Sequence, residues 1–302
     1  MAKSNLFKAK FSGPRHKTIA EVAEKFLEPK AKKEVLKLLQ KISASTKSLK
    51  DIATWADEIK PRSASKPTDK ETTDFLKKFP DSGEWHFVDL PVDATGYDAT
   101  KYAAFTRADD IVQTCIESIN ILTGNSTKFS KPNALRWLVH LIGDMHQPLH
   151  IACSYVDYSK AKPRLVFGRD EILKKDLLQK SDRGGNKINL PIGSKGKALH
   201  SYWDSDLPDK DKNFNNPTPV VIPAVSLDKL VQLPARWVGE NVQFAKEAYK
   251  GLTVKGINAV QKTNVDVTWN KTEYDNRCIP LIKDLSLKAA SRLAFLLNTI
   301  YA

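Results

Sequence analysis

Apolar residues recur at three- and four-residue spacing along most of this chain, a period that is typical of amphipathic α-helices. One segment, 48–59, also begins with Ser48 followed by Asp51, a start that resembles a capping box. The pattern favours a mainly α-helical protein. It predicts helices over 18–27, 31–42, 48–59, 103–122, 132–146, 235–250 and 284–301.

Strand signals are sparse by comparison. The best cover 85–92 and 186–192, which are short and flanked by Gly, Pro or Asp. The stretch 157–197 is rich in Lys, Arg, Gly and Asp, and we expect a helix over 170–180 and a small hairpin after it. Histidine-bearing motifs lie on both sides of this stretch, so it does not separate domains. We predict one domain over 1–302, with long loops and at most a small hairpin.

The charge balance adds information on partners. The 302 residues carry 48 Lys and Arg against 35 Asp and Glu, a formal net charge of +13. Such a surface attracts polyanions, for example nucleic acid or anionic lipid headgroups, and a basic surface also serves solubility. The composition leaves both explanations open.

Compartment and membrane signals are few. No apolar run approaches the roughly 18 residues of a membrane-spanning helix, so we expect no membrane span. No secretory signal is visible in the first residues, MAKSNLFKAKFSG. The cysteines Cys115, Cys153 and Cys278 lack the CxxC spacing of a zinc ribbon. They are compatible with one disulfide and a free thiol, or with three buried thiols.

The placement of the histidines points to metal chemistry. His140 and Asp144 stand four residues apart in one predicted helix, so they share a face of it. A carboxylate inside an apolar helix is costly to bury unless it meets a cation or hydrogen-bond donors. Pro148 disfavours helical geometry at Gln147, which should end or kink the helix and bring His150 in from a new direction.

His200 and Asp204 repeat this four-residue spacing further along the chain. Each such residue alone is more often a satisfied polar group of the core, but the whole set favours a metal centre, because imidazole and carboxylate are ligands of zinc. The set offers more ligands than one zinc ion uses. We predict two or three metal ions bound by His16, Asp57, His86, His140, Asp144, His150, His200 and Asp204.

Competing catalytic signatures are missing from the sequence. It contains no HExxH, GxxxxGK or GxSxG motif. A multi-metal site without them indicates hydrolysis of a phosphate ester, and the basic surface would hold a polyanionic substrate. We interpret His146 as a structural or supporting residue. The tryptophans are interpreted as packing residues, namely Trp55, Trp85, Trp137 and Trp203.

Five short motifs occur in an order and spacing that resemble one known family. They are WADEI around Asp57, WHFVD around His86, HLIGDMHQPLH at 140–150, RGGN at 183–186 and LHSYWD around His200. On these motifs the chain resembles the zinc-dependent single-strand nucleases, which include mung bean nuclease and the trypanosomatid 3′-nucleotidase/nucleases. The resemblance implies a mainly helical fold shared with zinc phospholipase C.

The resemblance also implies roles for individual residues. It assigns Asp57, His86, His140 and Asp144 to one buried zinc, with Asp144 bridging to a neighbouring ion, and it assigns His150, His200 and Asp204 to another. His16 would serve a third. Phe87 and Asp89 would hold a nucleobase, Lys60 would contact phosphate, and Asn186 would line the cleft. Among these residues, Asp144 and Lys60 are the ones for which we predict catalytic roles.

The implied activity is hydrolysis of single-stranded DNA and RNA to 5′-phosphorylated products, with 3′-nucleotidase activity as an extension. The resemblance further implies a secreted or periplasmic protein, and we expect a monomer. One departure leaves the zinc count open between two and three. The family pattern begins W-G-x-x-G-H, whereas this chain reads F-S-G-P-R-H over 11–16, so that Phe11 takes the place of the Trp and Arg15 that of a Gly.

Two other functions compete with the nuclease. A zinc phospholipase C would share the fold and most ligands, but Asp204 argues against it, since the phospholipases resemble this pattern with Glu at that position. A basic nucleic-acid-binding protein with an impaired zinc cluster would bind single strands without cleaving them. The altered segment 11–16 motivates that alternative, whereas the other ligand positions, all filled, argue against it.

Overall fold

The computed structural model describes residues 13–60, 69–193, 196–210, 214 and 217–302. Helices make up most of it, which confirms the predicted mainly α-helical class. The α-helices are α1 (Gly13–Lys25), α2 (Pro29–Ile42), α3 (Leu49–Ile52), α4 (Trp55–Glu58), α5 (Lys70–Lys78), α6 (Ile111–Thr123), α7 (Lys131–Asp144), α8 (Arg169–Lys174), α9 (Leu199–Ser201), α10 (Leu207–Lys210), α11 (Leu233–Val242), α12 (Ala245–Tyr249) and α13 (Lys271–Ile300).

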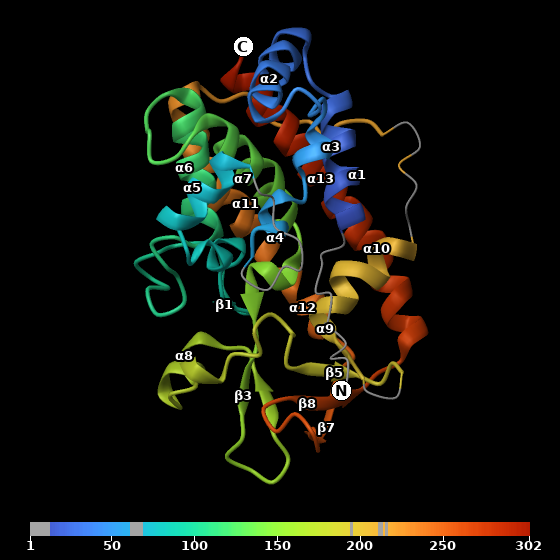
Figure 1. Cartoon of the computed structure of the whole chain (residues 1–302). Helices are drawn as coiled ribbons and strands as arrows, with labels where there is room; N and C mark the ends of the chain where they lie inside the picture. Colours follow the sequence, from blue (N-terminus) through green and yellow to red (C-terminus); the bar gives the residue numbers. More distant parts are fainter. Residues whose placement is uncertain (1–12, 61–68, 194–195, 211–213, 215–216) are drawn as a thin grey trace, which may run out of the picture.

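Helix α7 lies at the centre of the helical part, and its residues from Pro132 to Asp144 are all buried. It packs against α6, α13, α2 and α4 (Figure 1). The long helix α13 also packs against α1, so the last helix of the chain lies beside the first. The central position of α7 explains why its sequence is apolar on nearly all sides rather than on one stripe.

The boundaries of several predicted helices differ from the structure. The segment 48–59 is split into α3 and α4, and the turn between them frees the carbonyl of Ala53 for a hydrogen bond outside the helix. Helix α6 begins at Ile111 rather than 103, because the Asp110 side chain caps its first amide groups. The last helix begins at Lys271, where Asn270 provides the cap.

Short 3-10 helices and one π-helical turn complete the helical part. The 3-10 helices are η1 (Ser82–His86), η2 (Pro148–His150), η3 (Leu178–Lys180) and η5 (Leu227–Gln232), and the π-helical turn is η4 (Tyr202–Asp206). The predicted strand 85–92 is therefore 3-10 helix at its start, with a strand only at Leu90–Pro91.

Strands form three small sheets at one end of the molecule (Figure 1), more than the single hairpin that the sequence predicts. The predicted hairpin after α8 is present, as the antiparallel pair β5–β6 in a four-stranded sheet of order β6-β5-β8-β7. The strands are β1 (Leu90–Pro91), β2 (Ala152–Cys153), β3 (Tyr155–Asp157), β4 (Arg164–Val166), β5 (Ile188–Leu190), β6 (Lys197–Ala198), β7 (Thr253–Ile257) and β8 (Val265–Thr268).

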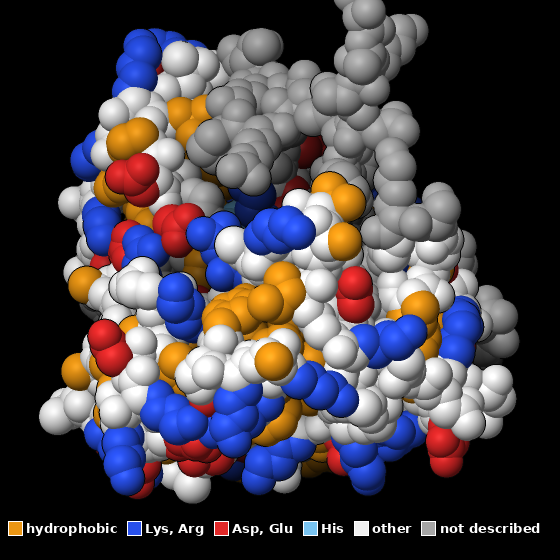
Figure 2. Space-filling model, turned by 90° about the horizontal axis from the view of Figure 1, so that it is seen from below, with side chains coloured by type: hydrophobic (Ala, Val, Ile, Leu, Met, Phe, Trp, Pro, Cys, Tyr) orange, Lys and Arg blue, Asp and Glu red, His pale blue; other side chains and the backbone are white. Residues whose placement is uncertain are grey.

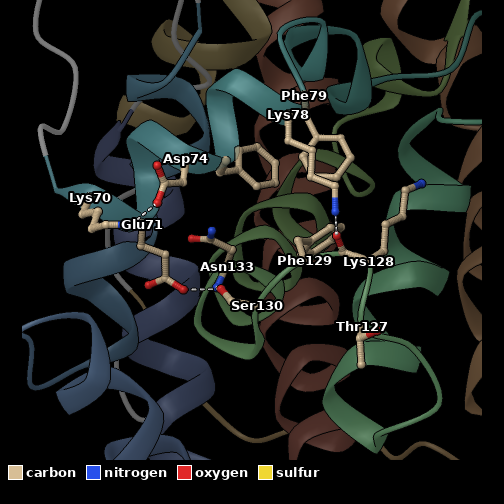
Figure 3. A pocket seen from close by; sticks show the side chains of 11 residues that line it. Lys70, Glu71, Asp74, Lys78, Phe79, Thr127, Lys128, Phe129, Ser130 and Asn133 are labelled. Carbon is tan, nitrogen blue, oxygen red and sulfur yellow. Dashed lines mark hydrogen bonds and ion pairs between the residues drawn. The ribbon is translucent and has the colours of Figure 1, made fainter.

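The surface is basic, as the composition indicates. On the face shown in Figure 2, Lys and Arg side chains are spread around a hydrophobic patch. A pocket of about 600 Å³ opens elsewhere, between α5 and the α6–α7 connection (Figure 3). Cys115, Cys153 and Cys278 are buried free thiols. No helix in the described ranges is long and apolar enough to cross a membrane.

Candidate metal centre

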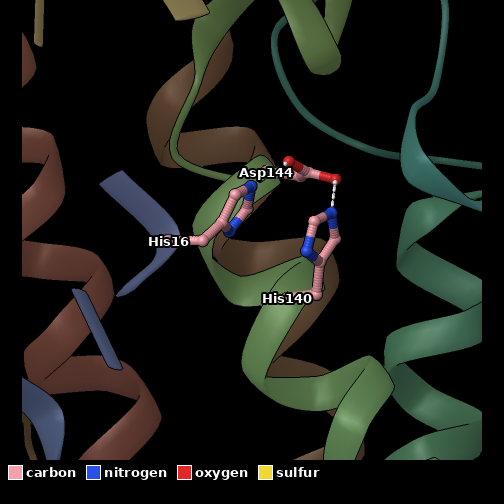
Figure 4. A group of neighbouring side chains, drawn as sticks. All are labelled: His16, His140 and Asp144. Atoms are coloured by element: carbon pink, nitrogen blue, oxygen red, sulfur yellow. Dashed lines mark ion pairs between the residues drawn. The ribbon is translucent and has the colours of Figure 1, made fainter. Parts of the chain in front are cut away.

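The centre is built on the end of α7. His140 and Asp144 lie one turn apart, and His140 Nε2 is 3.1 Å from Asp144 Oδ2. His16, from α1, approaches the same carboxylate, with its Nε2 3.1 Å from Asp144 Oδ1 (Figure 4). The rings of His16 and His140 are stacked, with their centroids 3.9 Å apart. Two side chains from α7 and one from α1 therefore meet in one buried cluster.

The chain changes direction after α7, as Pro148 predicts. The helix ends at Asp144, and Gln147 has an extended backbone, with φ −98° and ψ 112°. His150 then returns to the cluster. Its Nδ1 is 3.8 Å from Asp144 Oδ2, and its Nε2 is 3.7 Å from Asp204 Oδ1. His150 therefore connects the α7 residues to the second predicted pair.

The structure brings all eight predicted ligands together. In three groups, one possible ligand atom from each residue lies within 4.8 Å of the others, so that each group could hold a metal ion. His140 belongs to two groups, and His86 Nδ1 is 2.9 Å from Asp144 Oδ2. The groups are His16 with His140 and Asp144, Asp57 with His86 and His140, and His150 with His200 and Asp204.

Backbone carbonyl groups orient three of the histidines. His140 Nδ1 lies 2.8 Å from the carbonyl oxygen of Ala53, and His150 Nδ1 lies 3.0 Å from that of His86. His200 Nδ1 lies 2.8 Å from the carbonyl oxygen of Gly184. A carbonyl only accepts, so each Nδ1 carries the proton. This leaves Nε2 of each ring facing a carboxylate, where it can hold either a second proton or a metal ion. Metal-binding histidines likewise donate the N–H of their other ring nitrogen to a carbonyl or carboxylate group.

Buried polar atoms in the cluster lack hydrogen bonds. Within the described ranges, these atoms include Nε2 of His86, Nε2 of His140 and Oδ1 of Asp144. Leaving such atoms buried and unsatisfied is costly. A cation bound between them, either a proton on Nε2 or a metal ion, would remove this cost. The donor set of imidazole nitrogens and carboxylate oxygens fits zinc.

Ionisation of the cluster follows from its mixed charges. Burial opposes the charged form of Asp144, but His140 and His150 lower its pKa well below the usual value. Burial also lowers the pKa of His86, to about 3. For His150, burial is outweighed by Asp144 and Asp204, which raise its pKa to about 9. Protons and metal ions therefore compete for the same buried nitrogens.

The predicted substrate residues lie close to these ligands in the chain. Lys60 Nζ is 2.6 Å from Asp57 Oδ1, so its ammonium group already pairs with a predicted ligand. Phe87 follows His86 and is half buried. Burial and the nearby Asp182 raise the pKa of Asp89 to about 6.

Asn186 is exposed and donates a hydrogen bond from Nδ2 to the carbonyl oxygen of Arg183 at 2.8 Å. Phe11 lies outside the described residues. The neighbouring Arg15 is buried, and its Nη2 donates to the carbonyl oxygen of Ile282 in α13 at 3.1 Å.

His146 and the tryptophans have the structural roles that we predict for them. His146 Nδ1 lies 2.7 Å from the carbonyl oxygen of Ile142, and its Nε2 accepts a hydrogen bond from Arg292 at 2.9 Å. The four tryptophans are buried, namely Trp55, Trp85, Trp137 and Trp203.

Supporting residues were missed in the sequence. Gln147 donates from Nε2 to Asp204 Oδ1 at 2.8 Å and so holds a predicted ligand. The RGGN turn holds another, because Gly184 supplies the carbonyl that faces His200. Buried Asp182 fixes this turn by accepting a hydrogen bond from the Gly185 amide at 3.0 Å. The signals in the sequence that could have indicated these supporting roles were the glycine pair of RGGN and the glutamine of HQPLH.

The RGGN turn needs its glycines. Arg183, Gly184 and Gly185 all have left-handed backbones, with φ of 56°, 58° and 80°. A Cβ atom on Gly184 would lie 2.1 Å from the carbonyl oxygen of Leu149. Only a residue without a side chain allows this approach.

Comparison with known proteins identifies the family to which the chain belongs. Residues 12–302 match the model of the S1/P1 Nuclease family. Nuclease S1 of Aspergillus oryzae is 26% identical over 65% of this chain and 53% of its own length. Nuclease P1 of Penicillium citrinum is 28% identical over 65% of this chain and 57% of its own length. Endonuclease 2 of Arabidopsis thaliana is 23% identical over 95% of this chain and 89% of its own.

The chain thus spans a little over half the length of nucleases S1 and P1, but most of the plant endonuclease. The match to the family model covers every residue that the structure describes, including every histidine and carboxylate of the centre. The chain belongs to the S1/P1 nuclease family.

Proposed function

We propose that this chain is a zinc-dependent phosphodiesterase that hydrolyses single-stranded DNA and RNA to 5′-phosphorylated products and also acts on 3′-nucleotides. The observation that supports this most is the convergence of three His/Asp groups around Asp144. Family membership supports it as well. We propose that the chain 1–302 works as one monomeric domain.

Each candidate site residue has its own role in the proposed reaction. Bound zinc ions would supply an activated water and offset the charge on the phosphate. Asp57, His86, His140 and Asp144 would hold one ion, and His150, His200 and Asp204 another, while His16 is the residue available for a third. Lys60, which pairs with Asp57 at the edge of the cluster, would contact a phosphate oxygen. Asp89 and Asn186 would contact the base and line the cleft.

Phe87 is proposed as the platform on which a base stacks. Its ring is half buried, yet Phe87 is absent from the described hydrophobic residues that pack against the core. We expect Phe87→Ala to weaken single-strand binding about tenfold, because base stacking contributes roughly 1–3 kcal/mol. Metal content and melting temperature should hardly change. Phe26→Ala, a half-buried ring that packs on the core, is the matched control and should mainly lower stability. Equal loss of metal and affinity in Phe87→Ala would mean that the ring is structural.

The decisive assay is incubation of single-stranded DNA with the zinc-loaded protein, with and without chelator, and analysis of the products by mass. We expect 5′-phosphorylated fragments that disappear with chelator and return with zinc. Vesicles of phosphatidylcholine form the parallel substrate. Intact DNA in the presence of bound zinc would refute the nuclease. Release of phosphorylcholine would then favour a phospholipase, and binding without cleavage an inactive nucleic-acid-binding protein.

Export from the cytoplasm is part of the same proposal and rests on the family resemblance alone. We propose a secreted or periplasmic enzyme. Fractionation of the native cells, with detection of the protein by antibody, tests this directly. Recovery in the cytoplasmic fraction alone would contradict it.

A further inference from the structure

Two β-hairpins at the strand-bearing end of the molecule form one surface. They are β3–β4 and β7–β8 (Figure 1). The Tyr158 hydroxyl group, in the first connection, donates to the carbonyl oxygen of Thr263, in the second, at 2.7 Å, so the two connections lie side by side. We call the two hairpins, 155–166 and 253–268, the hairpin face. None of its residues belongs to the candidate metal centre.

Positive charge is concentrated at this end of the molecule. The segments 155–193 and 250–268, which contain the hairpin face, carry twelve Lys and Arg against six Asp and Glu, an excess that is nearly half of the net +13. Asp157, on β3, already pairs with Lys175 at 2.7 Å. The face therefore attracts an anionic partner. Four of its exposed lysines pair with no acidic residue that the structure describes, namely Lys160, Lys162, Lys255 and Lys262.

An apolar side chain projects from the tip of the β7–β8 hairpin. Val260 is 88% exposed, and Ile257, at the end of β7, is 44% exposed. The turn fixes this position, because Asn258 Oδ1 accepts hydrogen bonds from the amides of Val260 at 3.0 Å and Gln261 at 2.7 Å. Asn258 is itself held by a hydrogen bond from its Nδ2 to Asp266 Oδ1 at 2.8 Å. The exposed valine therefore belongs to an ordered turn.

A cavity of about 410 Å³ between the hairpins adds apolar surface. Lys162 and Arg164 line it, and none of the described residues around it is acidic. Four partly buried hydrophobic side chains also line it, namely Leu165, Phe167, Leu252 and Val254. Figure 2 shows this end of the molecule, where Lys and Arg side chains surround hydrophobic ones. Exposed apolar surface with a charged rim is typical of interaction sites for proteins or membranes.

These features favour a lipid bilayer over a nucleic acid as the partner. Nucleic acid also attracts lysines, but it has no hydrocarbon region for an aliphatic tip. The structure describes every residue of the two hairpins, and none of them exposes an aromatic ring on which a base could stack. An anionic bilayer offers both complements, because its headgroups attract lysines and the boundary between headgroups and acyl chains accepts apolar side chains.

We propose that the hairpin face docks this protein on an anionic lipid bilayer. Val260 enters the boundary between headgroups and acyl chains, and the lysines contact the headgroups. The binding is peripheral, and it weakens as salt concentration rises, because it depends on exposed charges. It goes beyond the proposed hydrolysis and needs no metal ion, since the candidate ligands lie outside the hairpin face.

The test is sedimentation of the full chain with vesicles of equal parts phosphatidylserine and phosphatidylcholine, in chelator so that no lipid is hydrolysed. Vesicles of phosphatidylcholine alone are the neutral comparison, and we expect much weaker binding to them. Lys160→Gln/Lys162→Gln should weaken binding to the anionic vesicles about twentyfold, because each lysine near the surface contributes about fivefold. Val260→Ser should weaken it about fivefold, because it removes apolar area from the bilayer.

Each variant has a matched control elsewhere on the surface. Lys32→Gln/Lys33→Gln removes two exposed lysines from α2, and Val221→Ser removes a valine that is 92% exposed. Both controls should bind the anionic vesicles as the wild type does. Melting temperatures verify that all four variants are folded, and cleavage of single-stranded DNA in zinc is measured separately as a readout of the proposed function alone.

Loss of vesicle binding in the two hairpin variants and in neither control supports the proposal, whether or not the protein cleaves DNA. A wild type that ignores anionic vesicles, or binds neutral ones equally well, overturns it. Unchanged vesicle binding in both hairpin variants also overturns it. If the lysine variant instead loses affinity for a single-stranded 12-mer in chelator and keeps vesicle binding, the face is a nucleic-acid surface and the proposal is wrong.

Discussion

Asp144→Asn should abolish phosphodiesterase activity, with a loss of about a thousandfold or more, since metal-assisted charge stabilisation contributes several kcal/mol. The carboxylate lies within 3.1 Å of nitrogen atoms from His16, His86 and His140. Asparagine has nearly the same shape, but it lacks the charge that would hold two ions. Zinc content, measured by plasma mass spectrometry, should fall together with activity.

The matched control for this prediction is Asp228→Asn, which removes one carboxylate at an exposed position. It should keep both zinc and activity. Unchanged turnover in Asp144→Asn would contradict the proposed bridging role. Lost activity with full zinc content would assign the carboxylate a task other than metal binding.

Gly184→Ala should lower the free energy of unfolding by about 3 kcal/mol or more, because it adds a severe clash to a strained backbone. The new methyl group would lie 2.1 Å from the carbonyl oxygen of Leu149 and 3.3 Å from His200 Nδ1. Relief of that clash moves the carbonyl group that orients His200, so zinc affinity of the group containing His150 and Asp204 should fall as well. Denaturant unfolding with and without zinc measures both effects.

Gly251→Ala is the matched control for the clash. Gly251 also has a left-handed backbone, with φ of 83°, but an added Cβ there meets nothing within 4 Å. It should cost only about 1–2 kcal/mol, the penalty of that backbone conformation for a residue with a side chain. An equal loss of unfolding free energy in the two variants would show that backbone strain alone destabilises them and that the contact with Leu149 does not contribute.

The sequence predicted much of the grouping of the candidate ligands, because most of these residues obey local rules. The i, i+4 spacing of His140 and Asp144 and the break imposed by Pro148 need no knowledge of the tertiary fold. The same holds for His200 and Asp204. How these motifs meet was supplied only by the family resemblance, because hydropathy carries no information on which distant segments pack together.

The groups that orient the candidate ligands were beyond local reasoning. Ala53, whose carbonyl faces His140, is chemically indistinguishable from any other alanine in the sequence. Its role arises from the break between α3 and α4, where the pattern predicts one continuous helix. Asp182 is a similar case, because its neighbours Ser154 and Tyr249 come from remote parts of the chain.

Because the three thiols are unpaired, the proposed metal ligands would also have a role in the stability of the fold. Without disulfides among the described residues, no covalent cross-link joins their distant segments. Side chains from residue 16 to residue 204 converge on one point, so ions bound there would close very long loops and stabilise the folded chain by mass action. The bound ions would then cross-link distant segments in the way that disulfides do in other proteins. The zinc concentration would therefore determine the stability of the folded protein as well as its activity.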